Sequence, residues 1–239
     1  MPDDDPTSRR GFVRVVGVTA TGLLVGGCAT TPKADGKDKD QGKGEEDVSP
    51  AEDLMREHGV LKRILLVYGE AIRRIDANQD LPPEPVLDAA KIIRTFVEDY
   101  HEKLEENFLF PRFRKANTLV DLVDLLERQH EGGRRVTDVT LRFANLKSLR
   151  EDGERKQLRE SMAQFIRMYN PHEAREDTVL FPAFRKVVSK HEYDSLGEDF
   201  EDKEHELFGD DGFEKMVDRV AGIEKSLGIY DLAQFTPTV

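Results

Sequence analysis

The stretches HEKLEENFLFPRFRKA (residues 101–116) and HEAREDTVLFPAFRKV (residues 172–187) decide the fold, because they are near-copies of one another. Nine of the sixteen aligned positions are identical, and the copies start 71 residues apart. Each begins with a His, carries a Glu four residues later and then reaches Leu-Phe-Pro. A His and a Glu at this spacing lie on one face of a helix. The repeat therefore predicts two similar helices that present the same pair of polar side chains.

The composition of the 239-residue chain is typical of a soluble helical protein. Charged residues make up 35% of it and aromatic residues 8%, with no Trp. The net charge of −12 argues against nucleic acid as a partner, because phosphate binding needs clustered positive charge. The single cysteine, Cys28, excludes an intramolecular disulfide and a cysteine-based metal site.

Residues 1–27 are predicted to be a secretory signal. SRRGFVR (residues 8–14) resembles a twin-arginine export signal, and the apolar stretch after it is shorter than the ~20 residues that span a bilayer. Val-Gly-Gly-Cys, ending at Cys28, resembles a lipobox whose cysteine carries a lipid. We therefore expect an exported lipoprotein on the periplasmic or cell-surface side; a transmembrane anchor is the alternative. Residues 28–49, rich in charged residues and Gly, predict a flexible tether.

Residues 50–190 are predicted to form an all-α, up-down-up-down antiparallel four-helix bundle with short connections. The first helix begins with the capping sequence Ser-Pro-Ala-Glu at residues 49–52 and runs to about Asp76. The second follows a turn at residues 78–85, the third spans about 118–146, and the fourth starts near residue 153. Residues 191–239 are predicted to add a C-terminal helical extension.

Each predicted bundle helix carries one histidine on its apolar stripe. The first two histidines are 43 residues apart and the last two are 42 apart, so each half of the bundle has the same layout. Two such hairpins packed about a pseudo-twofold axis bring the histidines, with the two repeated glutamates, into one layer of the core. The six predicted site residues are His58, His101, Glu105, His130, His172 and Glu176.

A metal site explains this layer better than a chance set of core residues. Burying a carboxylate costs several kcal/mol unless it is paired, and a cation would satisfy all six groups at once; a buried His–Glu hydrogen-bond network is the alternative. Imidazole with carboxylate suits iron, manganese or zinc. Four His and two Glu are more ligands than one tetrahedral zinc ion takes. They suit two octahedral ions, each bound by two His and bridged by the two Glu. Such ions keep positions for a small molecule.

The duplicated HEKLEENFLFP and HEAREDTVLFP motifs resemble the hemerythrin-like, HHE cation-binding family over about residues 50–190. The resemblance implies that the six residues bind two iron ions. Two features depart from the oxygen-carrying members: Arg134 stands where those have a further His, and Glu176 follows His172 by four residues where those have an Asp at five. Both departures weaken the case for reversible oxygen carriage and imply a sensor or repair branch of the family.

The leading hypothesis is an envelope-anchored di-iron protein that binds or senses a small diatomic molecule, such as oxygen or nitric oxide, or peroxide. An enzyme is the alternative, as a di-iron oxidase, peroxidase or nitric oxide reductase; the sequence leaves turnover open. A further alternative is a bundle in which the metal is only structural.

Several neighbouring residues carry weaker expectations. Glu102 and Glu173 each follow a ligand histidine directly and could be extra ligands. Helical geometry rotates them about 100° away from those histidines, so we expect them not to bind the metals. The Gly132-Gly133 pair indicates either close helix packing or room for a small ligand. Tyr169 is expected to fill the core or to donate a hydrogen bond near the metals.

Two further expectations concern prolines and the remaining histidines. The prolines of the Leu-Phe-Pro motifs, Pro111 and Pro182, are expected to bend or end their helices, and Pro171 to kink one. His191 is expected to be exposed, and for His205 an exposed position and an accessory metal role both remain open.

Overall fold

The structure is a computed structural model that describes residues 48–238. Every regular element in this range is a helix, so the all-α prediction is confirmed. The predicted signal, residues 1–27, and nearly all of the predicted tether, residues 28–49, lie outside the described residues. Among the described helices, none is long and apolar enough to cross a membrane.

The first helix, α1 (Pro50–Asp76), begins and ends where the sequence predicts. Ser49 is its N-cap, and its hydroxyl accepts a hydrogen bond from the Glu52 backbone N–H at 3.3 Å. Pro50 occupies the first helical position, where a missing N–H costs no helical hydrogen bond. The predicted capping sequence therefore fixes where the described bundle starts.

The second stretch is one helical run from Pro83 to Lys115 that contains two π-helical segments. A π-helix pairs each N–H with the carbonyl five residues back, and such segments are frequent at functional sites. The sequence pattern did not predict them. The run comprises α2 (Pro83–Ile92), η2 (Ile93–His101), α3 (Glu102–Leu104), η3 (Glu105–Leu109) and α4 (Phe110–Lys115).

The third and fourth stretches form the second half of the bundle. The third is a regular α-helix, and the fourth repeats the π-helical interruption of the second. Their elements are α5 (Val120–Phe143), α6 (Leu146–Arg150), α7 (Asp152–Arg175), η4 (Glu176–Leu180) and α8 (Phe181–Val187).

Pro111 and Pro182 do not end their helices, which continue to Lys115 and Val187. Each proline is the second residue of an α-helical segment that directly follows a π-helical one. A missing N–H is tolerated at that position. The change of hydrogen-bond register before each proline therefore lets the helix run on.

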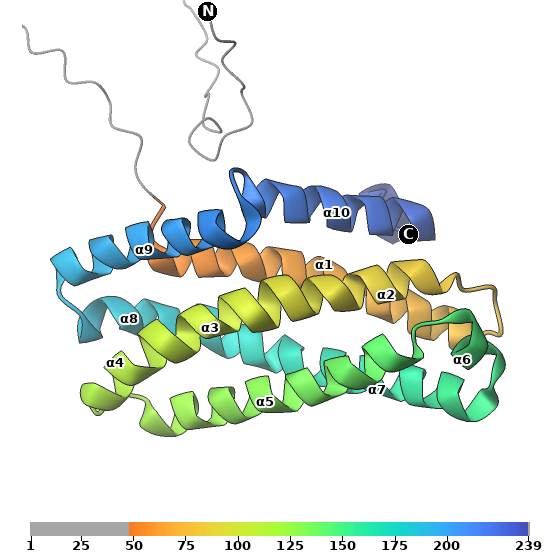
Figure 1. The fold of residues 1–239 in the computed structure, drawn as a ribbon, viewed down its shortest axis with the longest axis horizontal. Coiled ribbons are helices and arrows are strands. Elements are labelled where there is room, and N and C mark those ends of the chain that lie inside the picture. The colour runs from red at the N-terminus through yellow and green to blue at the C-terminus, as the bar shows by residue number, and fades with distance from the viewer. Residues whose placement is uncertain (1–47, 239) are drawn as a thin grey trace, which may run out of the picture. The chain divides into compact units, whose positions relative to one another are not determined.

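The C-terminal helices pack against α1. Ser189 caps α9 (Lys190–Phe208) by accepting a hydrogen bond from the Glu192 N–H at 3.2 Å. Helix α10 (Gly212–Leu227) contacts α1, α2 and α9, and the short η5 (Leu232–Phe235) follows it. Figure 1 shows α9 and α10 lying along α1.

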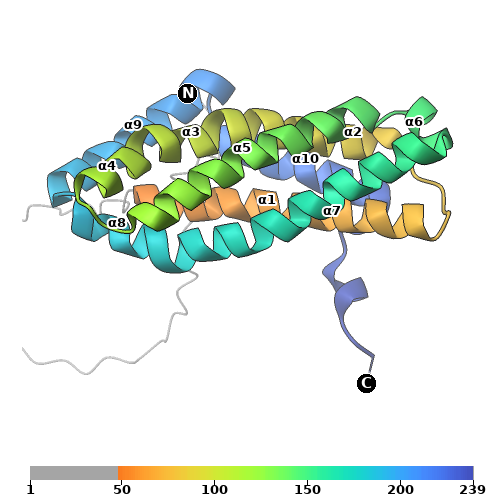
Figure 2. The ribbon, with the colours of Figure 1, turned by 90° about the horizontal axis from the view of Figure 1, so that it is seen from below.

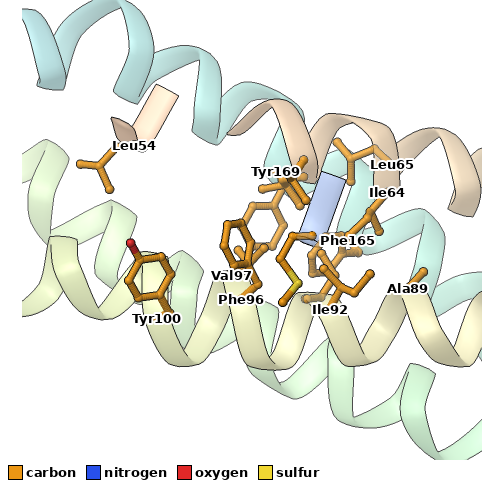
Figure 3. Packing of buried hydrophobic residues seen from close by; sticks show 14 of the residues in the cluster. Leu54, Ile64, Leu65, Ala89, Ile92, Phe96, Val97, Tyr100, Phe165 and Tyr169 are labelled. Carbon is orange, nitrogen blue, oxygen red and sulfur yellow. The ribbon is translucent and has the colours of Figure 1, made fainter. Parts of the chain in front are cut away.

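The long helices enclose a common core. Helix α5 packs along α7, α7 along α1, and α2 with η2 contacts both α1 and α5 (Figures 1 and 2). Figure 3 shows apolar side chains from three of these helices meeting in the interior, among them Ile64, Ile92 and Phe165. Their burial supplies the main driving force for the bundle.

Gly133 of α5 is explained by close packing. A Cβ at this position would lie 3.0 Å from Cε2 and Cζ of Tyr169 and closer still to its hydroxyl. At Gly132 a Cβ would meet Met168 Sδ at 3.7 Å and Arg135 Nη2 at 3.9 Å, which are ordinary contacts. Of the two explanations for the glycine pair, the structure favours packing, and it assigns that role to Gly133 alone.

The two glycines give a matched pair of substitutions. We expect Gly132→Ala to stabilise the protein by about 0.5–1 kcal/mol, because Ala is the better helix former. Gly133→Ala should destabilise it, because the buried Tyr169 ring must move. Chemical denaturation of both variants measures the difference; an equal gain in stability from both would contradict the packing described here.

Glu98 of η2 is a fully buried carboxylate. Burial raises its pKa from 4.5 to about 7, although Arg94 Nη1 lies 3.1 Å from its Oε2. Between pH 4.5 and about pH 7 the folded protein keeps a proton on Glu98 that the unfolded chain has lost. Folding stability therefore falls as pH rises through this range.

The Glu98→Gln variant should show the sign of this effect. We expect it to raise the unfolding midpoint more at pH 8 than at pH 5, because only at the higher pH does the wild-type protein bury an ionised Glu98. The exposed Glu84→Gln serves as control and should show no such difference. A gain that is larger at pH 5 would refute the linkage.

Candidate metal centre

The structure brings all six predicted site residues into one buried layer. His58 lies on α1, His130 on α5 and His172 on α7, while His101 ends η2. None of the six is more than 4% exposed. The remaining two, Glu105 and Glu176, are the first residues of η3 and η4 and are fully buried.

Two of the histidines are oriented by residues on the neighbouring helix of the same half. His101 Nδ1 donates to Glu57 Oε2 at 2.7 Å. At the equivalent position of the second half, His172 Nδ1 donates to Gln129 Oε1 at 2.9 Å. Glu57 and Gln129 each directly precede the histidine of their own helix in the sequence. The pseudo-twofold relation therefore extends beyond the predicted residues.

The other two histidines are oriented by the opposite half. His58 Nδ1 donates to Asp177 Oδ1 at 2.7 Å, and His130 Nδ1 donates to Glu106 Oε1 at 3.1 Å. Asp177 and Glu106 each directly follow one of the layer's glutamates. Because carboxylate and amide oxygens are acceptors, each ring has a proton on Nδ1, so in the neutral imidazole the lone pair is on the Nε2 atom that faces the interior.

The Nε2 atoms face one another and the two glutamates. His130 Nε2 and His172 Nε2 are 3.2 Å apart, and when both rings are neutral each presents a lone pair to the other. His172 Nε2 lies 3.0 Å from Glu176 Oε1, and His130 Nε2 lies 3.3 Å from Glu105 Oε2. This is a convergence of electron donors, which a cation would stabilise.

These separations match those of donors around one ion. Two donors at about 2.1 Å from a metal lie about 3.0 Å apart at a right angle and about 3.4 Å apart at the tetrahedral angle. Glu176 meets this requirement on two sides, because its Oε2 lies 3.4 Å from His58 Nε2 while its Oε1 faces His172. A carboxylate with one oxygen toward each half has the geometry of a bridge between two ions.

The donors fall into two groups that share one glutamate. Within each group, one donor atom from every residue lies within 4.8 Å of the others, and Glu105 belongs to both. The groups are His58, His101 and Glu105, and Glu105, His130, His172 and Glu176. The residues present therefore fit two ions with a shared carboxylate.

Phenylalanines of the Leu-Phe-Pro motifs cover two of the histidines. Phe181 stacks on the His58 ring at 5.5 Å between centroids, and Phe110 stacks on His130 at 5.5 Å. Each phenylalanine thus packs against a histidine of the opposite half. The repeat therefore supplies a His, a Glu, an acceptor and an aromatic wall from one short segment.

Glu102 and Glu173 are buried beside the layer and paired with cations. Arg134 Nη2 lies 2.7 Å from Glu102 Oε2, and the Tyr169 hydroxyl donates to Glu102 Oε1. Lys62 Nζ lies 3.0 Å from Glu173 Oε2. Lys62 and Arg134 each follow a layer histidine by four residues, so these pairs are related by the same pseudo-twofold. Arg134 stands where the oxygen-carrying members have a further His, and here it pairs with the Glu102 carboxylate.

The pKa values of the layer show how strongly its groups interact. Burial alone would lower the pKa of His58, but Asp177 and Glu176 raise it to about 10. Burial and the charge of His58 lower the pKa of His101 to about 3. Burial and the adjacent Glu176 raise the pKa of Glu105 to about 8. Such opposed shifts are typical of functional sites.

Sequence reasoning missed the four acceptors, namely Glu57, Gln129, Glu106 and Asp177. Their signal was their repeated position directly beside a predicted ligand. The two C-terminal histidines lie apart from the layer: His191 is exposed as predicted, and His205 is exposed with Asp210 Oδ1 at 3.3 Å.

Comparison with known proteins places part of the chain in a recognised family. Residues 49–148 match the family described as the hemerythrin HHE cation binding domain. Uncharacterized proteins of Mycobacterium bovis and of two strains of Mycobacterium tuberculosis are each 46% identical over 232 residues, which cover 96% of this chain and 91% of the relative. No solved structure matches the chain. The matched range includes His58, His101, Glu105 and His130.

Removing an acceptor should loosen metal binding without removing a ligand. We expect Asp177→Ala to weaken metal affinity by about 10–100-fold, because the His58 ring loses the partner that fixes its orientation. Asp177→Asn keeps an oxygen acceptor and should have a smaller effect. Metal titration of both variants measures this; equal affinities for Asp177→Ala and the wild-type protein would show that the contact does not orient the ligand.

Proposed function

We propose that this chain holds two iron ions and binds a small molecule beside them. The premise is that it belongs to one family with the mycobacterial proteins it matches and carries a hemerythrin HHE cation binding domain. Manganese or zinc are the other ions that the donors suit. The small molecule is a diatomic ligand, such as oxygen or nitric oxide, or peroxide.

One observation carries this proposal. Four imidazoles, each anchored through Nδ1, direct Nε2 toward two buried glutamates at separations that suit ligands of the same ions. Anchoring of this kind fixes the ring orientation and raises the basicity of a metal-binding histidine. A hydrogen-bond network, the other interpretation of the layer, would need a second proton on some of the rings, so that their Nε2 atoms donate to the glutamates; a metal would replace those protons.

The ligand set that we propose is His58, His101, Glu105, His130, His172 and Glu176. In this arrangement each ion takes two histidines, and the two glutamates bridge. Six protein groups do not fill two octahedral coordination spheres, so positions remain for a small molecule. When bound, iron supplies reversible electron transfer and an open coordination position.

The chain's own residues shape the surroundings of such a ligand. Phe110 and Phe181 present apolar faces to the layer, while Tyr169 and Glu102 place polar groups beside it. Tyr169 also contacts the His172 ring, edge to face at 5.3 Å between centroids. Apolar walls with few polar groups are typical of sites for small ligands.

We also propose the wider architecture and the address of the protein. The four long helical stretches form an up-down-up-down antiparallel bundle, with α9 and α10 as an extension. The export signal and the lipidated Cys28 tether this bundle to the cell envelope.

Metal analysis of the protein isolated from envelope membranes tests the proposal. We expect about two iron ions per chain in the membrane fraction, and loss of metal in His101→Ala and His172→Ala. His191→Ala, which changes an exposed histidine outside the layer, is the control and should keep the full content. Unchanged metal content in the ligand variants would contradict the site, and protein found only in the cytosol would contradict the anchoring.

Spectroscopy of the loaded protein distinguishes binding from other roles. A near-ultraviolet absorption that changes reversibly with oxygen or nitric oxide supports binding. Consumption of peroxide or nitric oxide over many cycles would instead identify an enzyme. A colourless, zinc-loaded protein that is inert to these molecules would leave only a structural role for the metal.

A further inference from the structure

A second cluster of acidic side chains lies beside the layer, where α1 meets α9. Asp53 and Glu57 are one turn apart on α1, and Glu204 comes from α9. One carboxylate oxygen from each lies within 4.8 Å of the others, and all three residues are buried. Carboxylates this close repel one another strongly in an interior of low dielectric constant.

A buried phenol hydroxyl is directed at the same cluster. Tyr100 of η2 is 1% exposed, and among the described residues its hydroxyl has no hydrogen-bond partner outside this cluster, where it faces Glu57. Figure 3 shows this hydroxyl pointing toward the part of α1 that carries Leu54, the neighbour of Asp53. Burial and the charges of Glu57, Asp53 and Glu204 raise its pKa, as expected for a phenol beside these carboxylates. The hydroxyl is thus a fourth oxygen at the cluster.

Glu204 is held in place by the C-terminal helices. Its Oε1 accepts a hydrogen bond from the Phe213 N–H at the start of α10, at 3.0 Å. Both helices lie outside the matched range, residues 49–148. The cluster therefore combines two residues of the matched domain with one that only the extension provides.

The second half of the bundle has no equivalent cluster. When the two helices are aligned so that His58 matches His130, Glu57 corresponds to Gln129 and Asp53 to Leu125. Gln129 still orients His172, so orienting a histidine does not require a carboxylate at this position. The acidic character of Glu57, together with Asp53 and Glu204, therefore calls for a separate explanation.

We propose that Asp53, Glu57 and Glu204 bind an accessory cation, a hard divalent ion held through oxygen, with the Tyr100 hydroxyl beside it. Carboxylate and hydroxyl oxygens suit Mn²⁺, Mg²⁺ or Ca²⁺, and the cluster offers no nitrogen or sulfur donor. The cation would offset the mutual repulsion of the three carboxylates. It would also join α9 to α1 next to His101, whose Nδ1 donates to Glu57.

Manganese titration of the full chain tests this site, and the outcome does not depend on what fills the histidine layer. Free Mn²⁺ is followed by electron paramagnetic resonance in the wild-type protein and in Asp53→Asn/Glu204→Gln. We expect the wild-type protein to bind one more Mn²⁺ than the double variant. Each single variant should weaken that binding at least about tenfold, since even outer groups of metal sites contribute 10–100-fold.

Controls keep the test specific. Glu206→Gln removes one exposed charge from α9 and should leave the stoichiometry unchanged. Circular dichroism checks the fold; if the double variant does not fold, Tyr100→Phe replaces it and should weaken the same Mn²⁺ binding. Equal Mn²⁺ stoichiometry and affinity in the wild-type protein and a folded cluster variant would overturn the proposal, as would equal losses in Glu206→Gln.

Discussion

The burial of four imidazoles and two carboxylates in one layer is the constraint on which the rest of the structure depends. The Nε2 atoms of His130 and His172 face each other at 3.2 Å, and Glu105 and Glu176 lie fully buried between the histidines. Apolar packing above and below cannot stabilise such a layer, because desolvation penalises every ionised group in it. The carboxylates are tolerable only if positive charge enters the layer, either as protons on the histidines or as a metal cation, which agrees with the match of residues 49–148 to a cation binding domain.

The two halves of the bundle complete each other. Asp177 orients His58 and Phe181 covers it, whereas Glu106 and Phe110 do the same for His130. Each repeat segment therefore acts largely on the histidine of the other half. Neither hairpin alone can orient both of its histidines, so formation of the site and docking of the halves are coupled, and a metal bound there would contribute to the folding free energy.

The sequence was sufficient to predict the helices and the six residues of the layer, because both follow from spacing. Apolar residues at helical intervals placed each histidine inward, and the repeat placed Glu105 and Glu176 beside them. The π-helical segments were not predictable this way, since a shift from i→i+4 to i→i+5 pairing leaves hardly any trace in the composition. Those segments also explain why Pro111 and Pro182 do not end their helices, which was one of the two outcomes expected of them.

The acceptors escaped prediction for a different reason. A residue adjacent to a ligand points about 100° away on its own helix, and this argument set aside Glu102 and Glu173 as ligands. The same rotation directs Glu57, Gln129, Glu106 and Asp177 toward a neighbouring helix, where each meets a histidine that is distant in sequence. Such contacts depend on how the helices pack, which spacing within one helix does not determine.

The halves are related by symmetry in their ligands but not in their charges. Glu57 offers His101 a carboxylate, whereas Gln129 offers His172 a neutral amide. A carboxylate partner makes an imidazole the stronger electron donor. Two ions in the proposed centre would therefore differ in electron density although their ligands are the same. The difference between Glu57 and Gln129 would therefore make the two ions unequal, and a small molecule would bind more readily at one of them than at the other.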